Sequence, residues 1–549
     1  MLKITPLGGL GEIGLNMMVF EYGETMFIVD AGLMFPEDYM LGVDIVIPDI
    51  DYIRRNRDRV VGVVLTHAHE DHIGALPYLL REVNVPVYGT GFTLGIVRRK
   101  LDEHELSAMT TLYEVHPDQK LCLGPFELDF IRVSHSIVDG VGIAIRTPVG
   151  VVVHTGDFKI DHAAVDGMLT DVSKFARYGD EGVLTLLSDS TNVEKEGYTL
   201  SDRVVGENLT RIAQRSEGRI IVALFASNVA RIQQIVDIAH GMGRKVVFSG
   251  RSVEGTVKTA QELEKLFIPE GMEVDLRQMK TFSDEGVIVI TTGSQGEPMS
   301  ALARMAVGTH KQLKVRKGDT VILSSKFIPG NEKAIAYIIN NLYRRGADVI
   351  YDKISEVHVS GHAFQEELKL MMRLTRPRYL MPIHGEYRHL IHHGRLAKEI
   401  GIGSDRVILA ENGQTIGFDH REARVCGSVN TGRVLIDGKG IGDVGRSVLK
   451  ERRLLSEDGL VVVTLIFDEE TGIVMYGPEI TSRGFVFVTE TGHLIDDAQC
   501  VILEIVEEIK PGVADRPALI RAKIQRALKQ YFYFAIKRRP VIMPVILEI

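Results

Sequence analysis

Short, continuous runs of apolar residues dominate the first part of the chain. Such runs cover Thr25 to Gly32, VVGVVLTH (60–67), VVVHTGD (151–157) and GVLTLLSD (182–189). Because Val, Ile and Leu follow one another without polar alternation, the runs predict strands buried on both faces. The segment IGALPYLLRE (73–82) has the pattern of a helix instead. Buried strands with intervening helices predict a layered sandwich with the helices outside.

From about Gly197 the pattern changes to repeated units of strand, loop and helix. GRIIVALFASN precedes VARIQQIVDIAHGMG, GVIVITTGSQGEP precedes MSALARMA, and GDTVILSSKFIPG precedes NEKAIAYIINNLYRRG. These units predict a small α/β domain with a mostly parallel sheet. A further buried strand, RYLMPIHG (378–385), ends in a histidine whose chemistry assigns it to the first domain. The α/β domain is therefore expected to be an insertion.

At 549 residues the chain is too long for one hydrophobic core. We expect a discontinuous sandwich domain, an inserted α/β domain, a glycine-rich linker that contains GSVNTGRVLIDGKGIGDVG, and a small α+β C-terminal domain of ordinary size. The expected bounds are, in that order, 1–197 with 355–415, 198–354, 416–443 and 444–549.

Composition narrows the class of protein. Apolar residues make up 45% and charged residues 25%, with no low-complexity tract, so disorder is not indicated. The N-terminus does not have the pattern of a secretion signal, and no apolar stretch approaches the roughly 20 residues of a membrane helix. Three widely spaced cysteines argue against a disulfide framework or a thiolate metal site. We expect a cytoplasmic protein that does not bind a membrane.

The net charge of −9 gives a nucleic-acid-binding function no support, because phosphate affinity normally comes from clustered Lys and Arg. Local features must supply that affinity. One candidate is the basic stretch from Arg521 to Arg539, although its pattern is equally typical of a solvated helix face.

The densest chemical signal is THAHEDH (66–72), directly after VVGVVL. It places four side chains that can bind a metal, His67, His69, Asp71 and His72, within six residues. Surface histidines rarely gather so closely after a buried strand. Imidazole and carboxylate donors suit Zn or Mn, and the absence of cysteine favours a catalytic site over a structural one.

Other strand ends offer further ligands. His135 follows FELDFIRVS, Asp157 follows VVVHTG, and His384 follows RYLMPI. Each of them alone is more typical of a residue that only forms hydrogen bonds. Together they complete two coordination spheres, with Asp157 as the bridge. Two adjacent cations neutralise a scissile phosphate and generate hydroxide at neutral pH, so the pattern predicts a two-metal phosphodiesterase.

Three loops are candidates for binding a 5′-phosphate. They are FASN with Ala226, Ser227 and Asn228, SGRS with Arg251, and TGSQGEP with Ser294. Each loop follows a strand and precedes a helix, so its backbone N–H groups can form an anion pocket. Plain strand-to-helix turns explain each loop equally well.

The motifs, taken in order, resemble a known family. His67, His69, Asp71 and His72, together with Asp30, His135 and Asp157, resemble the metallo-β-lactamase superfamily. Asp189 in SDSTN, His362 in HVSGH and His384 in PIHGE resemble its nucleic-acid-processing β-CASP branch. GGLGEIG, DAGLMFPED, HTGDFK, MPIHGEYRHL, DGKGIGD and KRRPVIMP are similar to bacterial ribonuclease J. The likeness runs over nearly the whole chain and implies an αββα sandwich with an inserted β-CASP domain.

The resemblance also implies roles for individual residues. One Zn or Mn ion would be bound by His67, His69, His135 and Asp157, and the second by Asp71, His72, Asp157 and His384. Asp30 and Asp189 would orient imidazoles through their free N–H groups. His362, with Asp189 as its partner, would be the general acid or bind the scissile phosphate, and Asp71 would be catalytic as well.

Further contacts follow from the same resemblance. Substrate contact is implied along His358, Val359, Ser360, Gly361 and His362. A structural Ca ion is implied near the carbonyls of Leu41 to Val43 with Asp437, because oxygen ligands suit that ion. Homodimers or homotetramers, and proteins of an RNA-degradation complex, are the expected partners.

The implied activity is 5′ to 3′ exonucleolysis of single-stranded RNA with 5′-monophosphate ends, together with endonucleolytic cleavage, in RNA maturation and decay. Three alternatives stay open at this point. One is a β-CASP nuclease that acts on DNA, since nothing in the chain shows what reads the 2′-OH. Another is a small-ester hydrolase of the same fold. The third, a catalytically weak scaffold subunit, should have lost metal ligands that are all present here.

Overall fold

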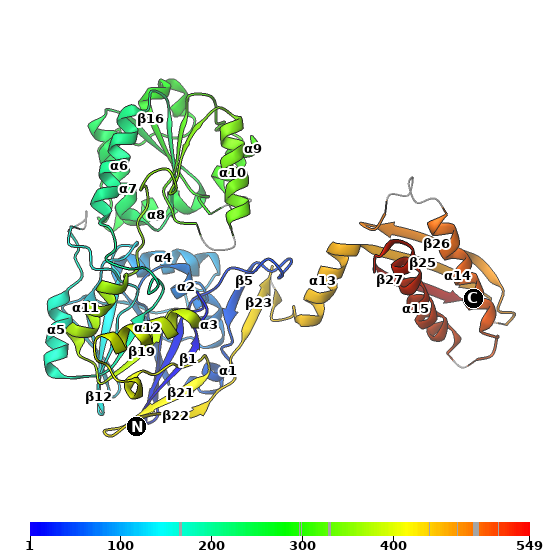
Figure 1. The fold of residues 1–549 in the computed structure, drawn as a ribbon, viewed down its shortest axis with the longest axis horizontal. Coiled ribbons are helices and arrows are strands. Elements are labelled where there is room, and N and C mark those ends of the chain that lie inside the picture. Colours follow the sequence, from blue (N-terminus) through cyan, green and yellow to red (C-terminus); the bar gives the residue numbers. More distant parts are fainter. Residues whose placement is uncertain are drawn as a thin grey trace. The chain divides into compact units, whose positions relative to one another are not determined.

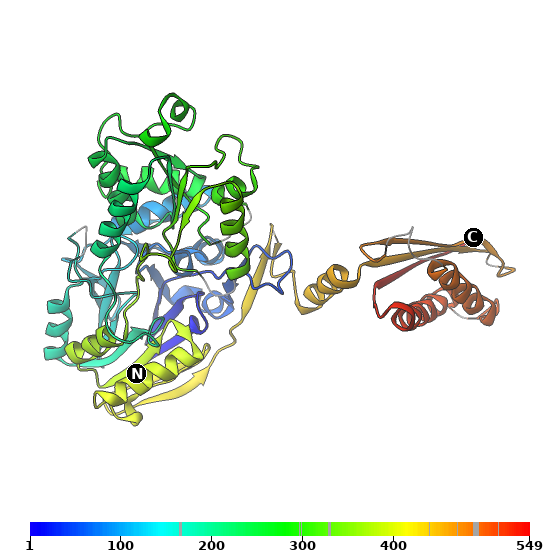
Figure 2. The ribbon, with the colours of Figure 1, turned by 45° about the horizontal axis from the view of Figure 1, so that its top comes forward.

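The computed structural model describes residues 1–549 except 164–166, 296, 298, 328–330, 439, 469, 487–492 and 514. The described residues form two compact units. The first combines Met1–Met34 with Ile47–Arg433, and the second combines Phe35–Val46 with Val434–Ile549. Figures 1 and 2 show the helices and strands of each unit.

Two sheets form the centre of the first unit. The larger has eight strands in the order β22 (Ala423–Ser428), β21 (Gln414–Phe418), β1 (Leu2–Gly8), β3 (Met17–Tyr22), β4 (Thr25–Val29), β6 (Val60–Val64), β7 (Val87–Gly89) and β8 (Leu112–Glu114). The smaller has six strands in the order β19 (Tyr379–Ile383), β13 (Val183–Asp189), β12 (Gly150–His154), β11 (Val141–Thr147), β10 (Phe126–Arg132) and β9 (Lys120–Leu123). The runs of Val, Ile and Leu in the sequence correspond to β6, β12 and β13.

Aromatic side chains fill the space between the two sheets. The rings of Phe20 and Phe27, from the larger sheet, stack with their centroids 5.0 Å apart. Phe126 of the smaller sheet meets Phe27 edge to face at 4.9 Å. Aromatic pairs of this kind add about 0.5–1.5 kcal/mol each to the burial of their surface. The two sheets therefore share one apolar core.

Helices cover the outer faces of both sheets. The core on the outer side of the larger sheet includes residues of α1 (Asp51–Arg55), α3 (Leu76–Glu82) and α4 (Gly91–Glu103). The core on the outer side of the smaller sheet includes residues of α5 (Val172–Glu181), α11 (Gln365–Thr375) and α12 (Tyr387–Glu399). The arrangement is the αββα sandwich that the sequence predicts.

The inserted domain is built on five parallel strands. Their order is β15 (Lys245–Ser249), β16 (Val287–Thr291), β14 (Ile220–Ala223), β17 (Thr320–Leu323) and β18 (Asp348–Ile350). One side packs on α6 (Asp202–Arg215), α7 (Val229–Gly241) and α8 (Arg251–Glu262), and the other on α9 (Ala301–Val307) and α10 (Glu332–Arg344) (Figure 1). β19 follows the insertion and pairs in parallel with β13, which precedes it.

The structure differs from the linker expected at 416–443. β21 and β22 in this segment extend the larger sheet, because β21 pairs with β1 and β22 pairs with β21. Ile416 and Phe418 of β21 are buried in the core between the two sheets, and Thr415 and Gly417 on the other face of the strand are buried too. Further along, β23 (Arg433–Asp437) and β24 (Gly440–Ile441) pair antiparallel. The glycine content of the segment concealed this pattern of strands.

The second unit contains a small α+β domain. Its sheet has the order β26 (Val474–Arg483), β25 (Leu460–Phe467) and β27 (Val541–Glu548). Every second residue of β25 is buried, against α14 (Leu494–Glu508) and α15 (Arg516–Ile536). α13 (Arg446–Asp458) precedes the sheet, and the basic residues at 521, 523 and 526 are exposed on α15. Among the described residues, no helix combines the length and apolar character needed to cross a bilayer.

Candidate metal centre

The loop after β6 contains four of the predicted ligands. The chain leaves β6 through Thr66 to His69, and α2 (Glu70–Ile73) begins at once, which places Asp71 and His72 on its first turn. Asp30, the residue after β4, accepts hydrogen bonds from Thr66 N and Oγ1, both at 2.8 Å. It also accepts one from His72 Nδ1 at 2.7 Å. Asp30 thus fixes the ring of His72 so that Nε2 points away from Asp30 and lies 3.2 Å from Asp157 Oδ2.

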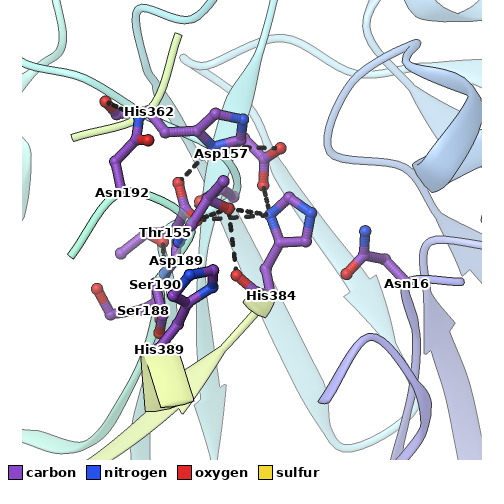
Figure 3. A network of polar contacts seen from close by, with 12 residues as sticks. Asn16, Thr155, Asp157, Ser188, Asp189, Ser190, Asn192, His362, His384 and His389 are labelled. Carbon is purple, nitrogen blue, oxygen red and sulfur yellow. Dashed lines mark hydrogen bonds and ion pairs between the residues drawn. The ribbon is translucent and has the colours of Figure 1, made fainter. Parts of the chain in front are cut away.

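Three strand ends of the smaller sheet bring the remaining ligands. His135 follows β10, Asp157 follows β12, and His384 directly follows β19. His384 has a φ of 51°, a left-handed backbone conformation that turns the chain sharply at the strand end. Figure 3 shows His384 pointing toward Asp157. His384 Nδ1 lies 3.0 Å from Asp157 Oδ1.

The seven predicted ligands form two adjoining sets. His67, His69 and His135 make one set, in which His69 Nδ1 lies 3.1 Å from both His67 Nε2 and His135 Nε2. The other set is Asp71, His72, Asp157 and His384, with ligand atoms all within 4.8 Å of one another. Asp157 Oδ2 also lies 3.7 Å from His67 Nε2 and 3.8 Å from His135 Nε2. Asp157 therefore adjoins both sets.

The donor atoms fit metal ions. In the first set, three imidazole nitrogens face one another with no carboxylate in hydrogen-bond contact between them. In the second set, His384 Nε2 is buried and forms no hydrogen bond of good geometry among the described residues, although Asp71 Oδ2 lies 3.3 Å away. A buried imidazole nitrogen without a good hydrogen-bond partner is unfavourable unless it binds a cation. Nitrogen and carboxylate donors are those that Zn and Mn prefer.

Electrostatics favour the ligand form of the first set. Burial, and next the neighbouring charge of His72, lowers the pKa of His67 well below its usual range. Burial lowers the pKa of His69 to about 4, and burial also lowers the pKa of His135. These imidazoles are neutral at pH 7, and neutral imidazole is the form that binds a metal.

The second set holds positive charge where a cation would bind. Burial lowers the pKa of His72 and of His384, but the charge of Asp157 outweighs it and raises both pKa values well above the usual range. Burial raises the pKa of Asp157, yet the charges of His384 and His72 outweigh it and hold this carboxylate ionised. A metal ion bound here would take the place of the two imidazole protons.

His362 and Asp189 form a pair beside these sets. His362 Nδ1 lies 2.8 Å from Asp189 Oδ2 (Figure 3). Asp189 ends β13, and its other oxygen accepts hydrogen bonds from Thr191 N at 3.0 Å and Oγ1 at 2.8 Å. Burial lowers the pKa of His362, but the charge and hydrogen bond of Asp189 outweigh it and raise the pKa. The side chain of His362 remains 20% exposed, so its ring is accessible from solvent.

The loop that carries His362 contacts the first set directly. The Gly361 carbonyl lies 2.8 Å from His135 Nδ1. A Cβ atom at Gly361 would lie 2.6 Å from the His135 ring, so only glycine fits. Asn192 Nδ2 donates to Ser360 Oγ at 2.6 Å and to the His362 carbonyl at 3.1 Å. The predicted substrate loop and the predicted metal centre are therefore one connected site.

The predicted phosphate loops are less clearly part of the site. Asn228 caps α7 by accepting from Arg231 N at 3.0 Å, and Ser294 is buried. Arg251 is exposed at the start of α8. Gly296 and Pro298 of TGSQGEP lie outside the described residues. Phosphate binding by Ala226, Ser227 and these residues stays a prediction.

The expected calcium site already contains a cationic side chain. Arg452 Nη1 donates to the Leu41 carbonyl at 2.9 Å, and Arg452 Nη2 donates to Asp437 Oδ2 at 2.5 Å. These are two of the oxygen groups assigned to calcium. An ion bound there with Leu41, Val43 and Asp437 would have to displace the guanidinium, so calcium binding stays a prediction.

Sequence reasoning missed Asn16. Its Nδ2 donates to the Asp71 carbonyl at 3.0 Å and lies 3.1 Å from His72 Nε2. Figure 3 shows Asn16 beside the site. Asn16 lies just after the turn-rich GGLGEIG, and no ligand-like spacing connects it with the histidines. Contacts of Gly361, Asn192 and Arg452 were missed as well, because their partners lie far away in the sequence.

Comparison with known families covers most of the chain. The model of the metallo-β-lactamase superfamily matches residues 10–169, and that of the ribonuclease J β-CASP domain matches 217–342. The model of the Zn-dependent metallo-hydrolase RNA specificity domain matches 347–408, and that of the ribonuclease J C-terminal domain matches 447–549.

Curated relatives match from end to end. Ribonuclease J 1 of Streptococcus pyogenes serotype M3 is 43% identical over 99% of this chain and 97% of its own. Ribonuclease J2 of Bacillus subtilis is 41% identical over 100% and 98%, and ribonuclease J of Thermus thermophilus is 42% identical over 100% and 95%. The chain belongs to the ribonuclease J family. The predicted family and fold are thereby confirmed, and membership makes the chain a hydrolytic ribonuclease.

A solved structure shares the ribonuclease J fold over much of the chain. The crystal structure of a protein of unknown function from Enterococcus faecalis matches 76% of this chain and 99% of its own, with a TM-score of 0.54. Its sequence identity of 16% limits the likeness to the fold. The roles of the individual site residues and the domain bounds stay predictions.

Proposed function

We propose that this ribonuclease hydrolyses single-stranded RNA from a 5′-monophosphate end, 5′ to 3′, with two metal ions, and that it also cleaves internally. The observation that carries the proposal is the convergence of seven side chains into two ligand sets that adjoin at Asp157. The description of the matched RNA specificity domain as Zn-dependent supports zinc as one of the ions.

The chain's own residues prepare the site for hydrolysis. The first set offers neutral imidazoles, and Asp71 and Asp157 are ionised because the histidine charges outweigh the effect of burial on their pKa values. Two ions bound there would neutralise the scissile phosphate and activate water. Asp30 holds His72 in the orientation that this binding needs.

His362 holds the proton for the leaving group. Its Nδ1 faces Asp189, so its Nε2 points to the other side of the ring, where substrate would lie. The raised pKa of His362 favours the protonated imidazole, the state that a general acid requires. In the proposed step, Nε2–H protonates the oxygen that leaves when the phosphodiester bond breaks.

The 358–362 loop is the proposed 5′-phosphate pocket. His358 Nδ1 is buried and has no hydrogen-bond partner among the described residues. Ser360 and Gly361 let a phosphate approach the backbone beside His362. A pocket at a fixed distance from the metal ions would make the enzyme cleave one nucleotide after another from the 5′ end.

The test follows RNA labelled at either end, with a 5′-monophosphate or a 5′-triphosphate, in the presence of Zn or Mn. We expect mononucleotides from the monophosphate substrate and no hydrolysis by Asp71→Ala or His72→Ala. His362→Ala should slow cleavage by about 10²–10⁴-fold while elemental analysis still finds metal. Turnover by Asp71→Ala in buffer saturated with metal would show the ligand assignment to be wrong.

A DNA strand of the same sequence, with the same 5′-phosphate, is the matched substrate control. Equal or faster cleavage of DNA would contradict the choice of RNA. Full activity of wild-type enzyme on RNA would also contradict a scaffold role, which the complete set of ligands already disfavours.

A further inference from the structure

Two lysines from different domains meet beside the substrate loop. Lys195 lies in the loop after β13, and Lys326 lies in the loop after β17. The two ammonium groups lie close enough for the charge of Lys326 to lower the pKa of Lys195. Among the described residues neither forms an ion pair with a carboxylate, and the acidic charge that acts on Lys195 is that of the exposed Asp352. Like charges held this close repel each other unless an anion lies with them.

The backbone fixes Lys195 to the segment that follows His362. Lys195 N donates to the Asn192 carbonyl at 2.9 Å, and the Lys195 carbonyl accepts from Gln365 N at 3.0 Å. Lys195 Nζ lies 4.9 Å from the centroid of the Phe364 ring. The charge of Lys195 is therefore held over a ring that lies two residues beyond the proposed general acid.

Lys326 approaches the same loop from the inserted domain. Gln295 Nε2 donates to the Lys326 carbonyl at 2.7 Å and to Ser325 Oγ at 2.9 Å, which anchors the loop after β17. Burial, and next the charge of Arg231, lowers the pKa of His358 to about 3, and the charge of Lys326 contributes. Ser324 Oγ, two residues before Lys326, donates to the Val357 carbonyl at 2.6 Å. The loop that contains Lys326 therefore begins beside the residue before His358, whose Nδ1 has no partner among the described residues.

The other two cations near His358 are already neutralised. Arg231 Nη2 donates to Asp202 Oδ1 at 2.6 Å. Lys159 is paired with the other oxygen of Asp202 and lies 3.3 Å from Asp161 Oδ2. Lys195 and Lys326 thus carry the uncompensated positive charge at this point. Burial and the charge of Lys326 lower the pKa of Lys195 to about 8, so Lys195 is still mostly protonated at pH 7.

Aromatic rings beside both lysines favour a nucleic acid strand as the source of the anion. Phe327 follows Lys326 in the chain and stacks on Tyr351, with centroids 6.3 Å apart and an angle of 17° between the planes. Phe364 lies under Lys195. Alternation of cations and aromatic rings is typical of grooves that bind single strands, where phosphates meet the cations and bases stack on the rings.

We propose that Lys195 and Lys326 together bind one backbone phosphate of the RNA strand, next to the 358–362 loop. The pair takes one lysine from the sandwich domain and one from the inserted domain, so a bound strand would join the two domains. The inference rests on the proposed function, because it takes RNA as the substrate.

The test compares steady-state cleavage of 5′-monophosphate RNA by the full-length, metal-loaded enzyme and by Lys195→Met, Lys326→Met and the double variant. Each single variant should raise KM by about fivefold to tenfold with kcat nearly unchanged. The slope of log(kcat/KM) against the logarithm of the salt concentration should become less steep by about the amount expected for one phosphate contact. Because the two lysines share one phosphate, the double variant should lose little more than the larger single effect. Lys195→Arg should keep most of the wild-type KM.

Lys258→Met is the matched control, because Lys258 on α8 has a 78% exposed side chain and lies outside the proposed site. A series of RNAs, each with a neutral methylphosphonate linkage at a different position, tests the contact directly. At one position, Lys195→Met and Lys326→Met should no longer raise KM relative to the wild-type enzyme. Additive losses in the double variant, or no such position, would overturn the shared-phosphate proposal. Wild-type enzyme that cleaves no RNA would contradict the proposed function instead.

Discussion

Asp30 fixes the orientation of His72, which is one of the predicted metal ligands. Its carboxylate joins Thr66 and His72, and all three side chains are buried. Asp30→Asn keeps the shape but removes the charge and one acceptor oxygen. We expect a 10- to 100-fold loss of metal affinity with the fold retained, measured by competition with a chelator. Asp58→Asn is the control, because the Asp58 side chain is 96% exposed, and an equal loss there would contradict the role of Asp30.

His393 gives the protein a defined sensitivity to acid. The residue is fully buried on α12, with Nδ1 3.0 Å from Ser190 Oγ, and burial lowers its pKa from 6.5 to about 4. The unfolded chain therefore binds one more proton than the folded chain between these pH values. The free energy of unfolding should fall as the pH drops from 6.5 to 4, by about 3 kcal/mol for this residue.

Urea unfolding of wild type and His393→Gln at pH 7 and pH 4.5 measures this effect. The variant is expected to lose less stability between the two pH values, whatever its stability at pH 7. The same loss in both proteins would show that His393 does not contribute to acid sensitivity.

The sequence predicts the functional contacts of some residues and not of others. The convergence of the seven predicted ligands was foreseeable because they come after recognisable strands, and strand ends of a sandwich meet at one edge. Asn16 was not predictable because its contact with His72 depends on how distant loops pack. The same holds for Gly361, whose partner His135 lies 226 residues away in the chain.

At the scale of elements, a buried cluster of charges holds the residue before the predicted substrate loop, 358–362. Arg231 on α7 is fully buried, pairs with Asp202 on α6, and donates to the Val357 carbonyl at 2.9 Å. Arg231→Met would leave Asp202 and the carbonyl short of a donor. Breaking a buried pair in this way costs about 3–5 kcal/mol, so we expect that loss in chemical unfolding, together with a raised KM for RNA.

Arg203→Met is the matched control on α6, because Arg203 is 71% exposed and pairs with Glu207 one turn away. Its effect should stay within about 0.5 kcal/mol. A similar stability for both variants would show that the buried cluster does not hold the loop.

Buried strands with continuous apolar runs were predictable as elements, because short runs rich in Val and Ile favour strands that are covered on both faces. The strands in 416–443 were not, because β22 is largely exposed and β21 has only two large apolar residues, Ile416 and Phe418. Their place in the larger sheet is decided by pairing with β1, which lies at the other end of the chain.

At the scale of the whole molecule, the C-terminal domain has an apolar core of its own. The buried residues of this core all lie between Val461 and Ile546. We therefore expect a fragment of residues 445–549 to fold alone, with a cooperative unfolding transition and the near-UV signal of packed aromatic residues. Leu528→Ala, a change in the centre of this core, should destabilise the fragment by about 2–5 kcal/mol. A fragment without a cooperative transition would contradict an independent domain.

The contact between Gly361 and His135 has a thermodynamic consequence. The Gly361 peptide group contacts the ring of His135, a predicted metal ligand, and belongs to the predicted substrate loop, 358–362. Movement of the loop therefore alters the environment of that imidazole. Such linkage is reciprocal. If RNA bound at the loop raises the affinity of the site for metal ions, then bound metal ions must raise the affinity of the loop for RNA by the same factor. An enzyme of this design would release its ions most readily between substrates.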